Sequence, residues 1–476
     1  MTKYIMTIGI ECHVQLLTAT KLFSGADNDA RDKEPNSVVS PIDYGLPGML
    51  PILNREAITL AVKAGKALGA KIANVSRFDR KHYFYPDLPN GYQITQMYHP
   101  TILAGSIDVP LEDGSSIPVR IHHAHLESDA GKLTHYGDYS LVDLNRAGTP
   151  LIEIVSEPDM HSPQEAKAYA AELHKLMIYA GVTRGDLYHG NMRFDVNISI
   201  APEGATELGK RAEVKNLNSF KSVEKAAEYE YKRQVALLEK GERIVQETRG
   251  WDDATQKTSS QRSKEDAQDY RYMPDADIPP IILSDDEIAE IQTDVPLLPP
   301  YYRAKWNELG LDSSVIDSLL ARQSYAVLIA TIQDNAGDAV AKRVAHWFAS
   351  AVASSDEETA YIASNFVPEG FIELAQMVEK NELSSTAAKE VFNELLTSDK
   401  TPREIAETKN LLQVSDEAEI AKIVDEVLAD PASAKAIEDV KAGNDKVIGF
   451  LVGQIMKKSQ GKANPALAQK LIRERL

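Results

Sequence analysis

The sequence has only one cysteine and no long apolar run. With Cys12 alone among 476 residues, no disulfide can form within the chain, as is usual for proteins of the reducing cytosol. No stretch approaches the roughly 18 apolar residues that span a bilayer, and the first residues lack the basic and apolar segments of a signal peptide. We therefore expect a cytoplasmic protein that makes no use of a membrane.

Several common catalytic motifs are also missing. The sequence has no Walker loop, no GxSxG elbow, no glycine-rich dinucleotide fingerprint and no CxxC or HExxH zinc motif. These absences argue against the enzyme classes that such motifs define.

Acidic residues outnumber basic ones, but the charge is unevenly distributed. The formal net charge of −19 argues against a protein that coats nucleic acid with its whole surface. Residues 411–440 carry eight acids and two bases, whereas residues 441–476 carry eight bases and two acids. From this count alone a solvated helical face is favoured, and a nucleic-acid surface is the alternative.

Residues 7–16, TIGIECHVQL, alternate between polar and apolar side chains, which is the pattern of a half-buried strand. The even positions are apolar and include Cys12. The odd positions carry Glu11 and His13. Cys12 therefore belongs to the core and is a poor candidate for a nucleophile, whereas Glu11 and His13 share the opposite face.

Four further segments repeat this alternation, and each places a carboxylate on its polar side. The shared polar positions are His123, His125, Glu127 and Asp129; Glu153 and Glu157; Arg193, Asp195, Asn197 and Ser199; and Glu213 and Lys215. Alternating strands joined by turns predict an antiparallel sheet with one face packed on helices, and hence an α+β fold.

Carboxylates gathered on one sheet face repel each other unless a cation or basic groups neutralise them. Glutamate oxygens with one imidazole and several waters describe a Mg²⁺ site that also takes nucleotide phosphates, which Arg80 and Lys81 could help to neutralise. Zinc is a rival, because HHAH and His13 supply imidazoles. A polar sheet surface without a ligand is the plainer interpretation, and the residue pattern leaves these alternatives open.

The chain divides at a proline-rich segment. In the first half, helices are predicted at 56–69, 162–181 and 222–241, and strands around 5–16, 118–129, 138–157, 192–200 and 209–218. Six prolines between Pro274 and Pro300 interrupt regular structure. Helical patterns follow, including 321–333, 339–350, 371–379 and 387–396, with an amphipathic helix over 420–428. We predict domains at 1–294, 295–405 (all-α) and 406–476 (small and helical).

Residues 83–96, YFYPDLPNGYQITQ, are rich in aromatic residues and proline. Such a segment is more often a packed loop than a surface on which nucleic-acid bases stack. A packed loop is therefore the prediction.

A series of motifs runs in one order along nearly the whole chain. They are IGIECHVQL, YGLPGMLPILN, FDRKHYFYPDLPNGYQITQ, HLESDAGK, LVDLNRAGTPLIEIVSEPD, EVKNLNSF, QETRGWDD, RSKEDAQDYRYMPDADIPP and GFLVGQIMKKSQGKANP. Each is weak alone. Together they closely resemble the B subunits of the bacterial aspartyl/glutamyl-tRNA amidotransferases, the GatCAB complexes.

The resemblance implies a ligase that forms carbon–nitrogen bonds with glutamine as amido donor. In that family the B subunit activates the side-chain carboxylate of misacylated Glu-tRNA(Gln) or Asp-tRNA(Asn) with ATP, and ammonia then displaces phosphate. The implied fold is a glutamine-synthetase-like cradle, a helical domain and a tRNA-binding tail. The implied partners are an amidase (A) subunit that supplies ammonia and a small C subunit, in a heterotrimer. The chain itself lacks the GGSSGGS amidase signature.

The resemblance also assigns residues. The implied metal ligands are His13, Glu127 and Glu153, with Glu11 adjacent, and Arg80 and Lys81 are expected at phosphate or on the ammonia route. Nucleotide or supporting roles are implied for Asp195, Asn197, Glu213 and Lys215. The tRNA backbone is expected at the basic terminus, with Lys457, Lys458 and Lys462 as leading candidates.

Three positions depart from the family pattern. Ser128 stands where a second acid is usual, so any part of the ammonia route there would be lined by a hydroxyl and water. Phe194 replaces a cysteine on the core side, and His123 stands where a basic residue is expected. None of these removes a proposed metal ligand.

Two other functions remain as alternatives. One is a non-catalytic tRNA-binding or assembly subunit, which the intact carboxylates argue against. The other is a free-standing metal-dependent kinase or ligase for small molecules, in which the helical modules and basic terminus would have no role.

Overall fold

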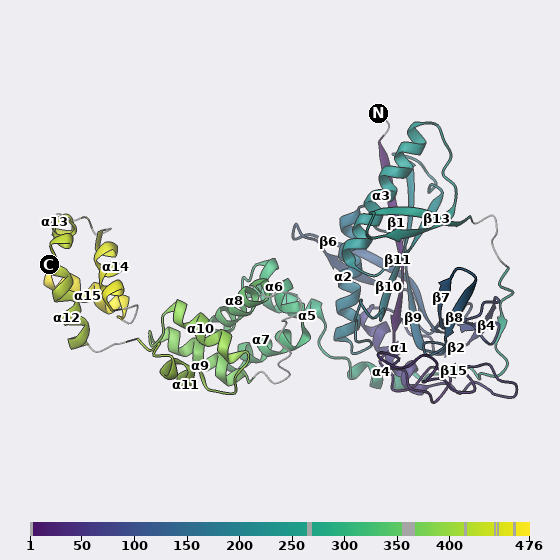
Figure 1. Cartoon of the computed structure of the whole chain (residues 1–476), viewed down its shortest axis with the longest axis horizontal. Helices are drawn as coiled ribbons and strands as arrows, with labels where there is room; N and C mark the ends of the chain where they lie inside the picture. The colour runs from purple at the N-terminus through teal and green to yellow at the C-terminus, as the bar shows by residue number, and fades with distance from the viewer. Residues whose placement is uncertain are drawn as a thin grey trace. The chain divides into compact units, whose positions relative to one another are not determined.

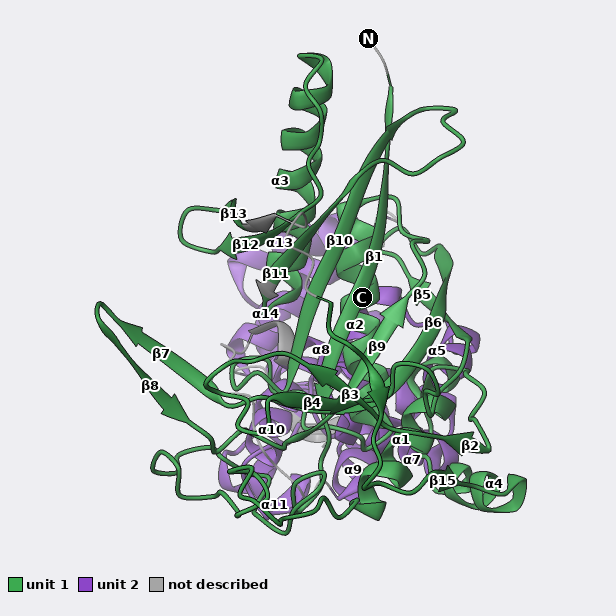
Figure 2. Ribbon diagram, turned by 90° about the vertical axis from the view of Figure 1, so that its right-hand side faces the viewer, with its two compact units in different colours: residues 1–301 green, residues 302–476 purple. Residues whose placement is uncertain are grey.

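The computed structural model describes residues 3–263, 269–354, 367–413, 417–441, 444, 447–459 and 463–476. The chain forms two compact units, residues 1–301 and 302–476, which Figure 2 distinguishes by colour. The first unit combines a large sheet with helices, and the described part of the second is helical. This confirms the predicted combination of an α+β part rich in antiparallel strands with a helical C-terminal part. The glutamine-synthetase-like cradle and the three-domain division stay predictions.

An eight-stranded sheet forms the centre of the first unit. Its order is β13-β12-β11-β10-β1-β9-β6-β5. The strands are β1 (Tyr4–Gln15), β5 (Gly105–Pro110), β6 (Ser116–Ser128), β9 (Pro150–Ser156), β10 (Met192–Pro202), β11 (Arg211–Leu217), β12 (Glu247–Asp252) and β13 (Lys257–Ser263). Neighbours are antiparallel except β11 and β12. That parallel pair departs from the prediction because a helix, α3, connects the two strands as a crossover.

Three helices cover the apolar face of this sheet. They are α1 (Arg55–Ala67), α2 (Pro163–Tyr179) and α3 (Phe220–Glu239). The even residues of β1 are buried in one core with these helices, and Cys12 is fully buried, as predicted. In Figure 1 the helix α2 lies on one side of the sheet, and β4 and the β7–β8 hairpin lie on the other. The polar residues of the sheet therefore line the face that these three helices leave uncovered.

Local signals in the sequence explain where α2 begins and ends. The Ser162 hydroxyl accepts a hydrogen bond from the Glu165 backbone N–H, and Pro163 occupies the first turn. Gly181 follows the helix at φ +70°, a conformation that favours glycine. The predicted helix is confirmed by these contacts.

Small elements flank the polar face. A three-stranded sheet contains β14 (Met273–Pro274), β3 (Asp79–His82) and β4 (Tyr92–Thr95), and a two-stranded sheet contains β15 (Ile281–Ile282) and β2 (Val75–Ser76). A hairpin joins β7 (Lys132–Tyr136) to β8 (Tyr139–Asp143). The prediction of a continuous strand pattern over 138–157 is wrong. A turn with Gly148 at φ +82° separates β8 from β9, and a Cβ on Gly148 would lie 2.8 Å from Asp43 Oδ1.

Helices make up the described part of the second unit. Helix α4 (Asp285–Thr293) precedes it, and α5 (Pro299–Glu308) begins just before it. Within it lie α6 (Ser313–Leu320), α7 (Gln323–Ala336), α8 (Asp338–Ser354), α9 (Pro368–Glu379), α10 (Ser385–Leu395), α11 (Pro402–Thr408), α12 (Glu417–Leu428), α13 (Ala434–Lys441), α14 (Ile448–Lys458) and α15 (Pro465–Arg475). The predicted helix 321–333 is shifted, because Gly337 at φ +83° ends α7 three residues later. Helices α12, α14 and α15 share an apolar core around Ile420, Val424 and Leu451.

Among the described residues, each helix taken singly is too short or too polar to cross a membrane. Only as a pair do the described helices α6 and α7 have the length and apolar composition of a membrane span, and this pair is bent by 117°.

Candidate metal and catalytic site

The register of β1 brings the polar residues of several strands together. In the antiparallel ladders His13 lies opposite Glu153 of β9 and Arg193 of β10, and Glu11 lies opposite Asp195. Residues paired across antiparallel strands share one face of the sheet. The odd residues of β1 therefore contact the polar residues of its neighbours, as the alternation predicts.

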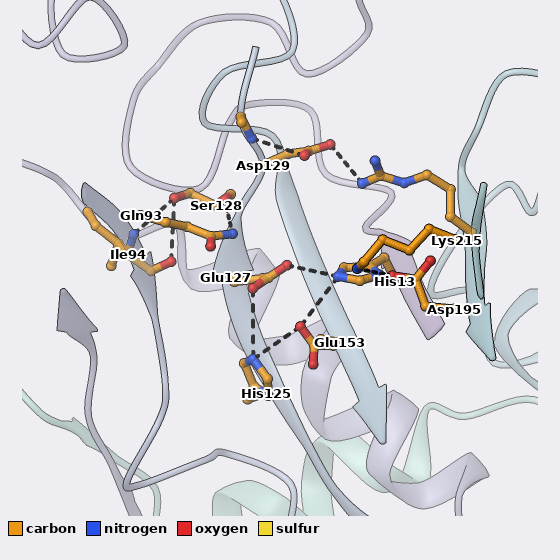
Figure 3. A network of polar contacts seen from close by, with 12 residues as sticks. His13, Gln93, Ile94, His125, Glu127, Ser128, Asp129, Glu153, Asp195 and Lys215 are labelled. Carbon is orange, nitrogen blue, oxygen red and sulfur yellow. Dashed lines mark hydrogen bonds and ion pairs between the residues drawn. The ribbon is translucent and has the colours of Figure 1, made fainter. Parts of the chain in front are cut away.

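His13, Glu127 and Glu153 form a compact cluster, which we call the histidine–glutamate cluster (Figure 3). His13 Nε2 lies 3.3 Å from Glu153 Oε2 and 3.5 Å from Glu127 Oε1. One ligand atom from each residue lies within 4.8 Å of those of the other two. One nitrogen and two carboxylate oxygens fit a divalent cation that keeps several waters, as Mg²⁺ usually does.

The electrostatics of this cluster couple the histidine to the two acids. Burial alone lowers the pKa of His13, but the hydrogen bond to Glu153 and the charges of Glu127 and Glu153 outweigh burial and raise it to about 9. Burial alone raises the pKa of Glu153. The hydrogen bond to His13 and the positive charges of His125 and His13 outweigh burial and lower this pKa overall. A protonated His13 imidazole thus offsets part of the charge of the two carboxylates. Because a metal-bound imidazole is neutral, cation binding would release this proton.

Glu11, Asp195 and Glu213 form a second group of acids whose oxygens lie within 4.8 Å of one another. Lys215 neutralises part of its charge, with Nζ 2.8 Å from Asp195 Oδ2 and 3.2 Å from Glu213 Oε1. Burial opposes its charge, but Asp195 and Glu213 raise the pKa of Lys215. Asn197 donates a 3.0 Å hydrogen bond to Glu11 Oε1. All five predicted residues therefore lie together, with an ammonium group where a cation would sit.

The structure separates Arg80 from Lys81, which point to opposite sides of β3. Arg80 pairs through Nε with Asp275 at 2.7 Å and through Nη2 with Asp277 at 2.6 Å, so it anchors a neighbouring segment, and its role at phosphate stays a prediction. Lys81 belongs with the site. Burial lowers its pKa, but the charge of Glu127, with smaller contributions that include Glu153, raises the pKa overall.

His125 is a contact of the cluster that the sequence analysis placed on this face but did not include among the site residues. Its Nε2 lies 3.8 Å from both Glu127 and Glu153. His123 Nε2 lies 3.1 Å from His125 Nδ1. Burial and the two adjacent histidines lower the pKa of His123 to about 4, so it is neutral near pH 7. The alternation that placed Glu127 on the polar face also placed His125 there, so the sequence contained the signal for His125.

The other departures from the family pattern lie away from the carboxylates. The Ser128 hydroxyl points to β4, where it contacts the Ile94 backbone at 3.4 Å, and Gln93 Nε2 donates to the Ser128 carbonyl at 2.9 Å (Figure 3). Phe194 is fully buried in the core, as predicted. Neither residue therefore changes the polar face.

Two of the three predicted tRNA-binding lysines, Lys457 and Lys458, lie at the end of α14. Lys457 is exposed, and Lys458 pairs with Glu426 at 2.6 Å. Lys462 lies outside the described residues.

Two clefts adjoin the polar face at opposite ends of β1. One, of about 640 Å³, is lined by Thr7, Glu11, Asn197 and Ser199, among others. The other, of about 380 Å³, is lined by Gln15 and by basic side chains that include Arg31, Arg146 and Arg184. These arginines pair with Asp29 and Asp129, so the second cleft carries charges of both signs.

This arrangement defines a class of protein: a two-unit protein whose large sheet carries a histidine–carboxylate site on its uncovered face. Comparison with known families identifies the class more closely. A family model described as "GatB/GatE catalytic domain" matches residues 6–289, and a "GatB domain" model matches residues 329–476. The chain belongs to the GatB family.

Curated relatives agree over the full length. The B subunit of the aspartyl/glutamyl-tRNA(Asn/Gln) amidotransferase of Persephonella marina is 45% identical, with 98% of each chain covered. Proteins of the same name from Geotalea daltonii and Caldanaerobacter subterraneus are 43% and 44% identical, and each match covers all of this chain and 99% of the relative.

Proposed function

We propose that this chain is the B subunit of a tRNA-dependent amidotransferase, a ligase that converts Glu-tRNA(Gln), Asp-tRNA(Asn) or both to the amidated forms. The observation that carries the proposal is the convergence of His13, Glu127 and Glu153 from three strands on one uncovered face. The names of the full-length relatives support the substrate class. The amidase (A) and small C subunits of the same complex are the proposed partners.

The proposed chemistry has two steps that share one site. A side-chain carboxylate of the aminoacyl group attacks the γ-phosphorus of ATP, and the bond from that phosphorus to the bridging oxygen breaks to release ADP. Ammonia then attacks the acyl carbon, phosphate leaves, and a proton passes from nitrogen to phosphate. Phosphorylation is needed because the unmodified carboxylate oxygen is a poor leaving group.

The side chains of this face have distinct parts in that scheme. His13, Glu127 and Glu153 would hold Mg²⁺, which supplies charge screening at the phosphates when bound. Lys81 places a cation beside these carboxylates and could bind a phosphate oxygen. Asn197 orients Glu11, and Lys215 fixes Asp195 and Glu213, so the neighbouring acids are already held in place.

The test uses the complete three-subunit complex, labelled ATP and charged tRNA. Phosphate release that depends on Glu-tRNA(Gln) or Asp-tRNA(Asn) would support the proposal. Phosphate release without tRNA would indicate a small-molecule kinase or ligase. A complex that binds charged tRNA but releases no phosphate would indicate a non-catalytic binding subunit.

A further inference from the structure

A group of aromatic side chains beside the histidine–glutamate cluster is more exposed than the packed loop that the sequence predicts. Phe84 is 79% exposed, Tyr85 is 55% exposed and Tyr98 is 58% exposed. Only part of the segment, such as Leu88 and Ile94, is buried. The prediction of a packed loop over residues 83–96 is therefore wrong for Phe84 and Tyr85, and the exposure of all three rings requires another explanation.

Tyr98 is the last of four tyrosines in contact that we call the tyrosine row: Tyr83, Tyr270, Tyr272 and Tyr98. Successive ring centroids lie 6.1, 6.0 and 6.3 Å apart, with the rings inclined by 69–73°. In such edge-to-face contacts a ring covers only one side of its neighbour. The row is thus an extended aromatic surface and not a closed stack.

The backbone around β3 holds this row in place. Strand β14 pairs with β3, the His82 backbone N–H donates to the Tyr270 carbonyl at 2.8 Å, and Arg80 binds Asp275. On the other side, buried Asp79 accepts hydrogen bonds from the Met97 and Tyr98 backbone N–H groups at 2.9 and 3.1 Å. Two segments that lie far apart in the sequence are therefore fixed to one short strand.

The tyrosine row leads to the catalytic face. Lys81 Nζ lies 5.0 Å from the ring centroid of Tyr270 and 6.0 Å from that of Tyr83. Lys81 is paired in register with Gln93, whose side chain binds the Ser128 carbonyl next to Glu127. In Figure 2, β3 and β4 lie close to β9 in projection, and β4 contacts β6 directly.

We infer that the tyrosine row, with Phe84 and Tyr85, is a stacking surface for the single-stranded 3′ end of the aminoacylated tRNA. The inference rests on the proposed function, which requires that end to reach Glu127 and Glu153. Proteins bind single strands without base readout by combining aromatic rings, on which bases stack, with a cationic side chain for the backbone. The row supplies the rings, and Lys81 lies where the row meets the carboxylates of the site.

The extent of the surface favours a strand over a mononucleotide. The four rings of the row, with successive centroids 6.1, 6.0 and 6.3 Å apart, extend beyond one base, and the exposed Phe84 and Tyr85 follow Tyr83 in the sequence. The cleft beside Glu11 and Asn197, which mixes hydroxyl and amide groups with charged side chains of both signs, is the better match for a nucleotide. We therefore assign the tyrosine row to the tRNA end.

The test measures binding of two uncharged tRNAs by the three-subunit complex: an intact tRNA, and one that lacks the last three nucleotides. We expect the wild-type complex to prefer intact tRNA by about tenfold or more, given the usual strength of base–aromatic stacking. Tyr98→Ala and Phe84→Ala should each weaken binding of the intact tRNA about fivefold and leave the trimmed tRNA unaffected. Both positions are exposed, so truncation should not disturb folding.

Matched variants separate stacking from simple apolar contact. Tyr98→Phe keeps the ring and should bind like wild type, whereas Tyr98→Leu should behave like Tyr98→Ala. An unchanged preference for intact tRNA in both alanine variants would overturn the inference, and so would a raised KM for ATP with normal tRNA binding. Amidation by the wild-type complex reports separately on the proposed function.

Discussion

At the scale of single residues, Glu153 is the acid on which the proposed metal site most depends. It contacts His13 directly and lies near His125, so one substitution alters the whole cluster. Glu153→Gln keeps the shape of the side chain and removes its charge. Loss of a residue that only supports a metal ligand lowers metal affinity or activity by about 10–100-fold. Glu153 is itself a proposed ligand, so we expect tRNA-dependent phosphate release to fall by more than about 100-fold.

A control for that variant lies on the same chain segment. Glu157 follows β9 and takes no part in the cluster. Glu157→Gln should leave phosphate release within about twofold of wild type. Equal loss in both variants, or full activity in Glu153→Gln, would contradict the assignment of Glu153.

His174 gives a pH dependence that is independent of the site. It lies in α2, where Nε2 contacts the Gly185 carbonyl at 2.7 Å and the ring packs edge-on against Phe220. Burial lowers its pKa below the ordinary value of 6.5. The unfolded chain then binds the proton first, so the free energy of unfolding falls as the pH drops below about 6.5 and is unaffected by this group above it.

Urea unfolding of wild type and His174→Gln at pH 7.5 and pH 5 measures this contribution. Other acids titrate in both proteins, so the comparison between them isolates His174. Wild type should lose more stability between the two pH values than the variant does. An identical loss would show that burial does not perturb this imidazole.

At the scale of elements, we predict that Arg80 stabilises the packing of β14 against β3 and does not bind phosphate. Asp275 is fully buried at its side chain, so removing Arg80 leaves an unpaired buried charge. We expect Arg80→Met to lower the free energy of unfolding by about 2–4 kcal/mol.

A double-mutant cycle with Asp275→Asn tests this pairing. Because the two residues contact each other, the double variant should lose less stability than the sum of the single variants. Additive losses would show that the pair makes no net contribution. A large rise in KM for ATP with unchanged stability would restore the phosphate role.

The alternation of side chains was sufficient to predict the two faces of the sheet, but not which polar groups meet. Glu11, His13, Glu127, Glu153 and Asp195 share a face because the strand period is two, and that period is visible in the sequence. The order of strands and their register depend on long-range pairing, which local patterns do not encode. Hence the sequence did not distinguish Arg80 from Lys81, although they are adjacent.

Local sequence patterns also fail to predict where the loops lie, for a different reason. The Gly148 turn interrupts the predicted strand pattern because Asp43, about a hundred residues earlier, occupies the space that a side chain would need. Tyr270 and Tyr272 join Tyr83 through β14, a strand of two residues that is too short to leave a pattern. Both features arise from contacts between distant segments.

At the scale of the whole molecule, the basic residues gather near the C-terminal end of an acidic chain. The net charge of −19 is spread over a chain whose last 36 residues carry eight bases and two acids. Lys457 is exposed there, and Lys458 is partly neutralised by Glu426. Lys457→Ala should therefore weaken tRNA binding more than Lys458→Ala does. Binding by the Lys457→Ala variant should also depend less on salt than binding by wild type does, measured by filter binding from about 50 to 200 mM salt. Equal effects of the two variants would contradict this.

The last prediction concerns the division of labour within the complex. Hydrolysis of glutamine needs an activated nucleophile, but the single thiol of this chain is buried in the core and the sequence has no GGSSGGS signature. The purified chain should therefore amidate charged tRNA with ammonium but not with glutamine, whereas the three-subunit complex should use both. At fixed total ammonium the rate should rise with pH, because only unprotonated ammonia is nucleophilic. Glutamine hydrolysis by the purified chain at the rate of the complex would show that the partner is not needed, and the ammonia would then have to be generated within this chain.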